Sequence, residues 1–272
     1  MRARAALFDV YGDHLLPRGA TAPVAALVRL LAPLGVTGPA VRTAISRMVR
    51  QGWLAPVRLA GGPGYALTGR AVRRLDDAAA RIYRTDEARA AWDGRWHLIV
   101  VSSAPATRSA RQRLAADLAF LGYGRLASGT WVAARPSPEA ASVAALHGSD
   151  VEAFAAHHAG DPLEMINRAW DLERLAVAYT VFVEELTPVV AAAGPDATDE
   201  HAFAARSRLV HAWRNFLFTD PGLPTDLLPA GWPGATAATF FDAEANRLLP
   251  AAGRYVDACL RPGSRAAAAR TA

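Results

Sequence analysis

Apolar residues recur with the period of an α-helix over the first fifty positions of the chain. They predict a first helix that ends at Gly12 and a second over Val24–Leu34. The second helix is expected to start at Thr21-Ala-Pro and to end at Gly35, and a third opens at Gly38-Pro39. Because only a few residues join the last two, the pattern predicts a helix-turn-helix unit.

The third helix has two faces of opposite character. Its apolar face comprises Val41, Ile45, Met48 and Val49, and its polar face comprises Arg42, Thr43, Ser46, Arg47 and Arg50. A basic stripe opposite an apolar one fits a helix that packs on its own domain and places guanidinium groups in a DNA major groove. A packed helical domain with a solvated basic face is the alternative that this pattern leaves open.

Two short runs after this helix are typical of strands. Trp53–Leu59 and Tyr65–Leu67 flank Gly61-Gly-Pro-Gly64, which predicts a hairpin, or wing. Together with the three helices, they predict a winged helix-turn-helix DNA-binding domain over residues 1–68. Arg58 is the basic residue nearest the wing tip, so we expect it to contact DNA as well.

From Trp96 onward, predicted strands alternate with predicted helices. The predicted order is strand, helix, strand, strand, helix, strand, which is that of a ferredoxin-like βαββαβ domain over residues 95–160. A linker helix over residues 69–94 is expected before it, and a C-terminal helical domain over residues 161–262 after it, beginning with a cap at Asp161. Within that domain a helix is expected over Thr236–Leu249, and residues 263–272 are expected to form a disordered tail. The fold class is therefore α+β.

Charge is unevenly distributed along the chain. Residues 1–84 contain thirteen arginines and four aspartates, a net charge of +9, whereas the remainder has a net charge of −4. The positive charge is thus confined to the segment with the helix-turn-helix pattern, as expected for a phosphate-binding module joined to a module that does not bind DNA.

Composition narrows the function further. All 30 basic residues are arginine, which excludes Walker-type phosphate loops and Schiff-base lysines. Cys259 is the single cysteine, which excludes an intrachain disulfide and fits a reducing, cytoplasmic location. No apolar run of 18 residues and no leader pattern is present, so neither a membrane span nor secretion is expected.

Several motifs together resemble the PaaX family of transcriptional regulators. They are Phe8-Asp-Val-Tyr-Gly-Asp-His-Leu-Leu, Val41-Arg-Thr-Ala-Ile-Ser-Arg, Gly52-Trp-Leu, Tyr65-Ala-Leu-Thr, Trp92-Asp-Gly-Arg-Trp and Asp220-Pro-Gly-Leu-Pro, followed by Leu-Leu-Pro and Trp-Pro-Gly. The resemblance implies a homodimeric repressor of an aromatic, phenylacetate-type catabolic operon. It also implies release from double-stranded operator DNA by an acyl-CoA effector such as phenylacetyl-CoA. A relative that senses another acyl-CoA or aromatic ligand remains an alternative. The glycine-rich wing tip departs from the arginine-rich wing of many members, which places more of the base recognition on the third helix.

An acyl-CoA effector requires arginines for its phosphates and an aromatic-lined pocket for its aryl group. One C-terminal stretch offers both kinds of residue, and its candidates for effector binding are Arg206, Arg208, Trp213, Arg214 and Phe216. A helix core with solvated arginines is the alternative interpretation of the same residues.

The ferredoxin-like pattern also raises the hypothesis of a metal-dependent nuclease. Such a site needs an acidic ligand at the end of the first strand, where this chain has Ser102 and Ser103. His157 and His158 are neighbours on an expected strand and would point to opposite faces. We therefore expect no catalysis, no metal and no cofactor.

Overall fold

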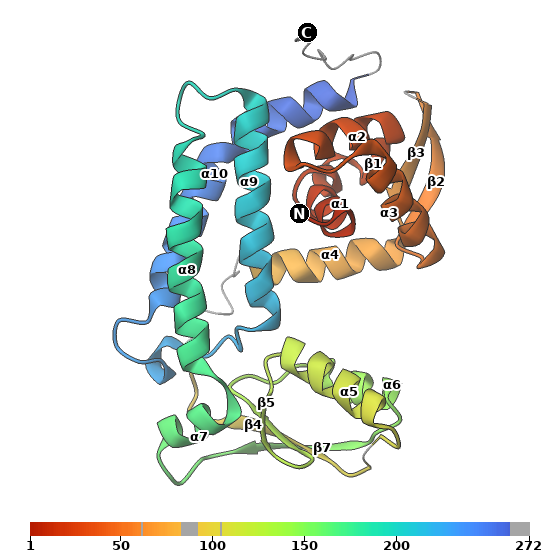
Figure 1. The fold of residues 1–272 in the computed structure, drawn as a ribbon. Coiled ribbons are helices and arrows are strands. Elements are labelled where there is room, and N and C mark those ends of the chain that lie inside the picture. The colour runs from red at the N-terminus through yellow and green to blue at the C-terminus, as the bar shows by residue number, and fades with distance from the viewer. Residues whose placement is uncertain (61, 83–91, 104, 262–272) are drawn as a thin grey trace. The chain divides into compact units, whose positions relative to one another are not determined.

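The computed structural model describes residues 1–60, 62–82, 92–103 and 105–261. The chain separates into two compact units, each made of segments that are distant in sequence (Figure 1). The first unit contains residues 1–83, residues 182–214 and the segment from residue 237 onward. The second contains residues 84–181 and 215–236.

The first helix of the first unit is longer than the sequence predicts. Helix α1 (Ala3–Val10) continues through a π-helical turn over Tyr11–Leu15 and a 3-10 turn over Leu16–Arg18. The prediction that it ends at Gly12 is wrong, because the apolar side chains of Tyr11 and Leu15 are fully buried and hold the backbone in a helical path. Glycine lowers helix stability by only about 1 kcal/mol, which such burial outweighs.

The second and third helices follow a short strand that the sequence did not reveal. Strand β1 (Thr21–Pro23) occupies the positions predicted to start a helix, and α2 (Val24–Leu31) begins directly after it. A 3-10 turn over Ala32–Leu34 leads to α3 (Gly38–Arg50). The error arose because proline is equally compatible with the first turn of a helix and with an edge strand.

Three antiparallel strands form the small sheet of this unit. β2 (Leu54–Leu59) and β3 (Gly62–Leu67) form a hairpin, and β1 pairs with the other side of β3, so that the order is β1-β3-β2. The second strand begins at Gly62, three residues before the position predicted from the sequence. Gly64 explains this extension, since a Cβ there would lie 2.6 Å from Leu59 Cδ1 and 2.7 Å from the carbonyl oxygen of Ala22. A glycine therefore allows the three strands to approach.

C-terminal helices complete the core of the first unit. Helix α9 (Asp199–Trp213) contributes Phe203, and α10 (Pro233–Leu260) contributes Ala252, Val256 and Cys259 to the buried cluster that contains the apolar faces of α1, α2 and α3. Helix α10 was expected to end at Leu249 but continues through Pro250. Its apolar positions remain buried on both sides of that proline, which offsets the lost hydrogen bond.

Two further helices lie where the chain passes between the units. α4 (Gly69–Ile82) lies within the linker helix that was expected over residues 69–94. Residues 92–94 are not helical, and residues 83–91 and 262–272 lie outside the described part of the chain. α8 (Leu172–Ala191) starts in the second unit and ends in the first. No single helix among the described residues is long and apolar enough to cross a membrane. The bent pair Val24–Leu34 and Gly38–Arg50 passes that test together, but its apolar residues belong to the core of the first unit.

The second unit contains the predicted alternation of strands and helices. The order is β4 (Trp96–Val101), α5 (Arg108–Phe120), β5 (Gly124–Ala127), β6 (Thr130–Ala133), α6 (Ala140–Leu146) and β7 (Val151–Ala156). The strands form an antiparallel sheet with the order β5-β6-β4-β7, and α5 and α6 cover one of its faces, as the buried cluster of Ile99, Leu114, Leu118 and Ala144 shows.

Helix α7 (Pro162–Ala169) follows the sheet and starts as expected. The carboxylate of Asp161 accepts a hydrogen bond of 2.9 Å from the backbone N–H of Leu163, which caps the helix, and Pro162 takes its first position. Two 3-10 turns, Arg214–Phe218 and Thr225–Leu227, lie in the segment that connects α9 to α10.

Candidate nucleic-acid interface

Helix α3 presents the polar face that the sequence predicts. Val41, Ala44, Ile45 and Met48 are buried, and the five polar candidates Arg42, Thr43, Ser46, Arg47 and Arg50 are all exposed. None of the three arginines forms an ion pair with a residue that the structure describes, so their guanidinium groups can take external hydrogen-bond acceptors. The spacing of these residues places them along one side of a helix of 13 residues.

Aromatic contacts connect α3 to the rest of the unit. Trp53 follows the helix, its backbone N–H donates to the carbonyl of Met48 over 2.9 Å, and its ring meets Phe8 of α1 edge-on with centroids 5.0 Å apart. The hydroxyl of Tyr11 donates to the carbonyl of Tyr65 in β3 over 3.0 Å. Burial raises the pKa of Tyr11, so this donor keeps its proton. The polar face of α3 is therefore carried on a packed scaffold.

The hairpin of β2 and β3 supplies fewer cations than α3. Arg58 is exposed on β2 and lies opposite Pro63 of β3. Arg70, at the start of α4, lies over the ring of Trp53 at 5.4 Å from its centroid. Position 61 lies outside the described part of the chain.

Two of the arginines predicted to bind an effector pair with the first helical segment of the chain. Arg206 is buried, with 3 % of its surface exposed, and donates to both carboxylate oxygens of Asp13 over 2.6 and 2.8 Å. It also donates to the carbonyl of Ala245. Arg214 donates to the carboxylate of buried Asp9, which His211 approaches to 2.7 Å. These contacts join α9 to α1.

The sequence interpretation missed Asp9 and Asp13 as partners of these arginines. A signal was present: they are the only acidic residues before position 76, and they stand four apart, one helical turn, within a largely apolar segment. Two acids on one face of an otherwise apolar helix call for cations elsewhere in the fold.

The remaining three effector candidates have different surroundings. Trp213 stacks on Phe241 with ring centroids 4.7 Å apart in the first unit, and Phe216 stacks on Tyr179 at 4.1 Å in the second. Arg208 is exposed and lines a pocket of about 460 Å³ in the first unit. Effector binding by the five residues stays a prediction, and Arg208 is the one among them that borders a described pocket.

Among the described residues, the end of β4 is followed by two serines and not by a cluster of carboxylates. The backbone N–H and hydroxyl of Ser102 donate to the carbonyl of Asp150, and the hydroxyl of Ser103 accepts from the backbone N–H of Asp150 over 3.0 Å. Both serines thus tie β4 to the start of β7. Within the residues that the structure describes, no three His, Cys, Asp or Glu side chains are grouped to hold a metal ion.

Three models of one protein family match successive parts of the chain. Residues 2–71 match the PaaX-like protein family, residues 89–165 match the PaaX protein central Cas2-like domain, and residues 170–258 match the PaaX-like protein C-terminal domain. The chain is 32% identical over 261 residues to the Transcriptional repressor PaaX of Escherichia coli (strain K12), covering 91% of this chain and 81% of that relative.

A solved structure agrees over nearly the whole length. The uncharacterized protein Rv0674 from Mycobacterium tuberculosis is similar with a TM-score of 0.60 and 26% sequence identity, over 94% of this chain and 98% of that one. Together with the three matched domains, these similarities show that the chain belongs to the PaaX family.

Proposed function

We propose that the protein is a transcriptional repressor that binds operator DNA sequence-specifically, with α3 as the recognition helix of a winged helix-turn-helix domain. The observation that carries this proposal is the exposed polar face of α3, whose arginines form no ion pair with any described residue. The similarity to the Transcriptional repressor PaaX of Escherichia coli supports the same role.

The chemistry of this face suits base recognition. Arg42 and Arg47 can each donate two hydrogen bonds to O6 and N7 of a guanine, while Thr43 and Ser46 can bond to a base or a phosphate. Arg50 and, on the wing, Arg58 add positive charge for the phosphate backbone. The net charge of +9 over residues 1–84 supports a DNA-binding role for this segment.

The other parts of the chain have roles in the same proposal. Residues 1–68 form the DNA-binding domain, 69–94 the linker, 95–160 a ferredoxin-like domain and 161–262 a C-terminal helical domain. The sheet order β5-β6-β4-β7 supports the ferredoxin-like assignment. Two copies form a homodimer that places its α3 helices in successive major grooves, about 34 Å apart. The protein acts in the cytoplasm, without catalysis.

An aryl-CoA effector, such as phenylacetyl-CoA or a relative, releases the repressor from its operator. Support comes from the pocket beside Arg208, which also includes His201 of α9 and Pro33 of the turn before α3. A phosphate bound by Arg208 would bear on that turn, so the effector would bind the DNA-free and DNA-bound conformations with different affinity. A coupling free energy of about 1–3 kcal/mol corresponds to a change of roughly 5–150-fold in DNA affinity.

The test uses the purified full-length protein and DNA from upstream of its own coding region. We expect a retarded complex in an electrophoretic mobility assay that survives excess random DNA and dissociates as phenylacetyl-CoA is titrated. Equal affinity for the upstream fragment and for random DNA would contradict the repressor. Specific binding that no aryl-CoA relieves would contradict only the effector.

A further inference from the structure

The first unit carries a cluster of two arginines and two aromatic rings outside the polar face of α3. The guanidinium carbon of Arg4 lies 5.5 Å from the centroid of the Phe8 ring, and that of Arg70 lies 5.4 Å from the centroid of the Trp53 ring. The two rings meet edge-on, with centroids 5.0 Å apart. We call these four residues the arginine–aromatic cluster, and they come from α1, the segment after α3 and the start of α4.

The two rings hold the two arginines in place. Phe8 and Trp53 are half-buried and pack against the core of the first unit, whereas Arg4 and Arg70 are exposed. A cation over the face of an aromatic ring is attracted by the negative charge of that face. Each arginine is therefore restricted in its conformations by a ring that the core itself fixes.

The cluster lies at the C-terminal end of α3. Arg50 of the polar face is the last residue of that helix, and Trp53 follows three residues later. Thr68 joins the start of α4 to the same end, because its hydroxyl donates to the carbonyl of Gly52 over 2.8 Å. Arg70 is therefore fixed beside the end of the helix that we propose to recognise bases.

The charge of the two arginines is not neutralised by any residue that the structure describes. Neither Arg4 nor Arg70 forms an ion pair or a hydrogen bond with such a residue. Asp9, which follows Arg4 on the same helix, is buried and already bound by Arg214. Since a cation–π contact leaves N–H donors of the guanidinium available, both arginines can bind an external anion.

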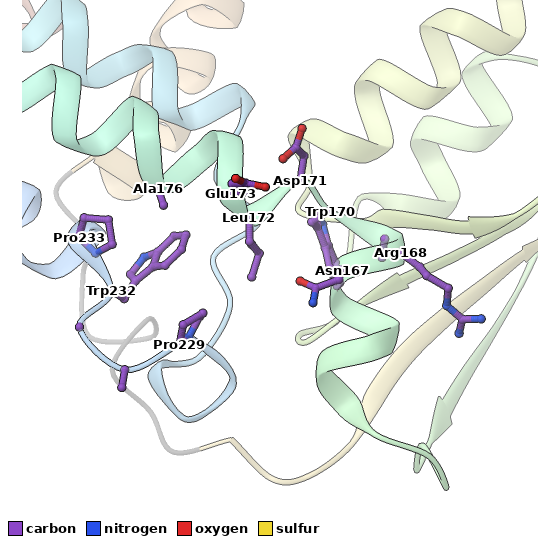
Figure 2. Close-up of a pocket in the computed structure, with 13 residues that line it drawn as sticks. Asn167, Arg168, Trp170, Asp171, Leu172, Glu173, Ala176, Pro229, Trp232 and Pro233 are labelled. Atoms are coloured by element: carbon purple, nitrogen blue, oxygen red, sulfur yellow. The ribbon is translucent and has the colours of Figure 1, made fainter.

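An exposed arginine of the second unit has the opposite surroundings. That unit contains a cleft of about 760 Å³ that Trp170 and Trp232 line, and Figure 2 shows Arg168 beside it. Arg168 is the one cation among the lining residues, and Asp171 and Glu173 line the same cleft. An anion that approached Arg168 would meet two carboxylates, so this residue is a suitable control for the loss of one exposed arginine.

Resting on the proposed DNA-binding function, we propose that Arg4 and Arg70 bind phosphate groups of the DNA backbone beside the bases that α3 contacts. Phe8 and Trp53 are the positioning residues that hold them there. A phosphodiester suits these donors because it is an anion whose oxygens accept the forked N–H groups of a guanidinium. Contacts to the backbone carry no sequence information, so the cluster adds affinity for any duplex and fixes the orientation of α3.

The test measures how DNA affinity depends on salt, because each phosphate contact releases counterions. Fluorescence anisotropy follows binding of the full-length protein to a random duplex and to the upstream fragment, between about 50 and 400 mM NaCl. The proteins are the wild type, Arg4→Gln, Arg70→Gln and the control Arg168→Gln. We expect each cluster variant to have a slope of log affinity against log salt that is shallower by about 0.9 on both duplexes. The loss of affinity relative to the wild type is then roughly sixfold larger at the low-salt end than at the high-salt end. Arg168→Gln should match the wild type.

A second set of variants tests the role of the ring. Trp53→Leu removes the aromatic face that Arg70 contacts, whereas Trp53→Phe retains one. We expect Trp53→Leu to reduce the salt slope as Arg70→Gln does and to add nothing when the two are combined, while Trp53→Phe keeps most of the wild-type slope. A purely structural role for Trp53 would lower affinity in the Arg70→Gln background as well. Circular dichroism checks that each variant folds, and Arg4→Gln and Arg70→Gln change only exposed side chains.

Failure of the cluster and failure of the repressor are separable outcomes. If Arg4→Gln and Arg70→Gln keep the wild-type affinity and slope, the cluster proposal is overturned while base recognition by α3 is unaffected. Losses on the upstream fragment alone would also overturn it, because phosphate contacts act on any sequence. If the slopes change as expected but the wild type binds both duplexes equally, the phosphate contacts stand and the proposed repressor function fails.

Discussion

Two aspartates near the start of the chain hold side chains of a helix that lies far along the sequence. Asp13 binds Arg206 across 193 positions, and both side chains are at least nine-tenths buried. A buried ion pair adds little net stability when compared with a well-packed apolar pair, but loss of one partner leaves an uncompensated charge. Because Asp13 belongs to the first helical segment and Arg206 to α9, the pair couples the scaffold of α3 to the C-terminal helices.

Replacement of Asp13 by asparagine tests this coupling. We expect Asp13→Asn to lower the free energy of unfolding by about 3–5 kcal/mol, since Arg206 keeps its charge in a buried site. Urea denaturation followed by circular dichroism measures the change. Asp257→Asn is the control, because Asp257 is half exposed and pairs with Arg18 at 2.8 Å, and it should cost no more than about 1 kcal/mol. Equal losses in the two variants would contradict the account.

We expect acid to lower the stability of the folded protein through protonation of His14. This side chain is 1 % exposed, and burial lowers its pKa from 6.5 despite Asp13 at 3.2 Å, while Arg206 and Arg18 lower it further. The folded state therefore holds a neutral imidazole that the unfolded chain protonates below pH 6.5. The unfolded state then binds more protons, so stability falls as the pH falls below about 6.5, by at most about 1.4 kcal/mol per pH unit.

The measurement is the free energy of unfolding between pH 5 and pH 7.5 for the wild type and His14→Gln. The difference between the two curves removes the contribution of other titrating groups, and we expect the wild type to have the steeper loss below pH 6.5. His201→Gln replaces an exposed histidine and should retain the wild-type slope. A slope that His14→Gln leaves unchanged would show that this histidine is not the source.

At the scale of elements, the periodicity of the sequence predicted the helices and strands that bury one of their faces. The polar face of α3 could be predicted because the 3.6-residue period alone determines which side chains share a side. The lengths of α1 and α10 were underestimated at Gly12 and Pro250, where a locally unfavourable residue is outweighed by burial against segments distant in sequence. Strand β1 was missed because three residues carry too little pattern to identify a strand.

The same distinction between local pattern and distant contact explains which features of the candidate sites could be predicted from the sequence. The exposure of Arg42, Arg47 and Arg50 follows from local periodicity, so it was predictable. The burial of Arg206 depends on a carboxylate 193 residues away, which no local pattern contains. The cleft that Trp170 and Trp232 line likewise forms from two segments that lie far apart in the sequence, residues 167–176 and residues 229–233.

The hairpin depends on the glycine at its crowded centre. In Gly64→Ala the new methyl group would meet the carbonyl oxygen of Ala22 at 2.7 Å, so β1 and β3 must separate. We expect a loss of about 1–3 kcal/mol in the free energy of unfolding and weaker DNA binding. Thermal denaturation and DNA titration measure the two effects. Gly69→Ala is the matched control, because a Cβ there would lie 3.7 Å from its nearest neighbour, the end of the Arg73 side chain. If Gly69→Ala and Gly64→Ala had equal free energies of unfolding, the steric cause would be contradicted.

At the scale of the whole molecule, charge and packing divide the chain in different ways. The net positive charge is concentrated in residues 1–84, whereas the first compact unit also includes residues 182–214 and the segment from residue 237 onward. The basic N-terminal segment therefore shares its core with α9 and α10. A ligand that shifts those helices would act directly on the scaffold that carries α3, which would give the proposed effector control a physical route.

The central claim is that the arginines of α3 read the bases of the operator. Its most direct test is fluorescence anisotropy of labelled operator and random duplexes with the wild type, Arg42→Ala, Arg47→Ala and Arg113→Ala. Arg113 is an exposed arginine of α5 and controls for the loss of one charge. We predict that Arg42→Ala or Arg47→Ala loses about 1–3 kcal/mol of operator affinity and much less on random DNA, while Arg113→Ala binds as the wild type does. Unchanged operator affinity in both α3 variants, or equal losses on operator and random DNA, would contradict it.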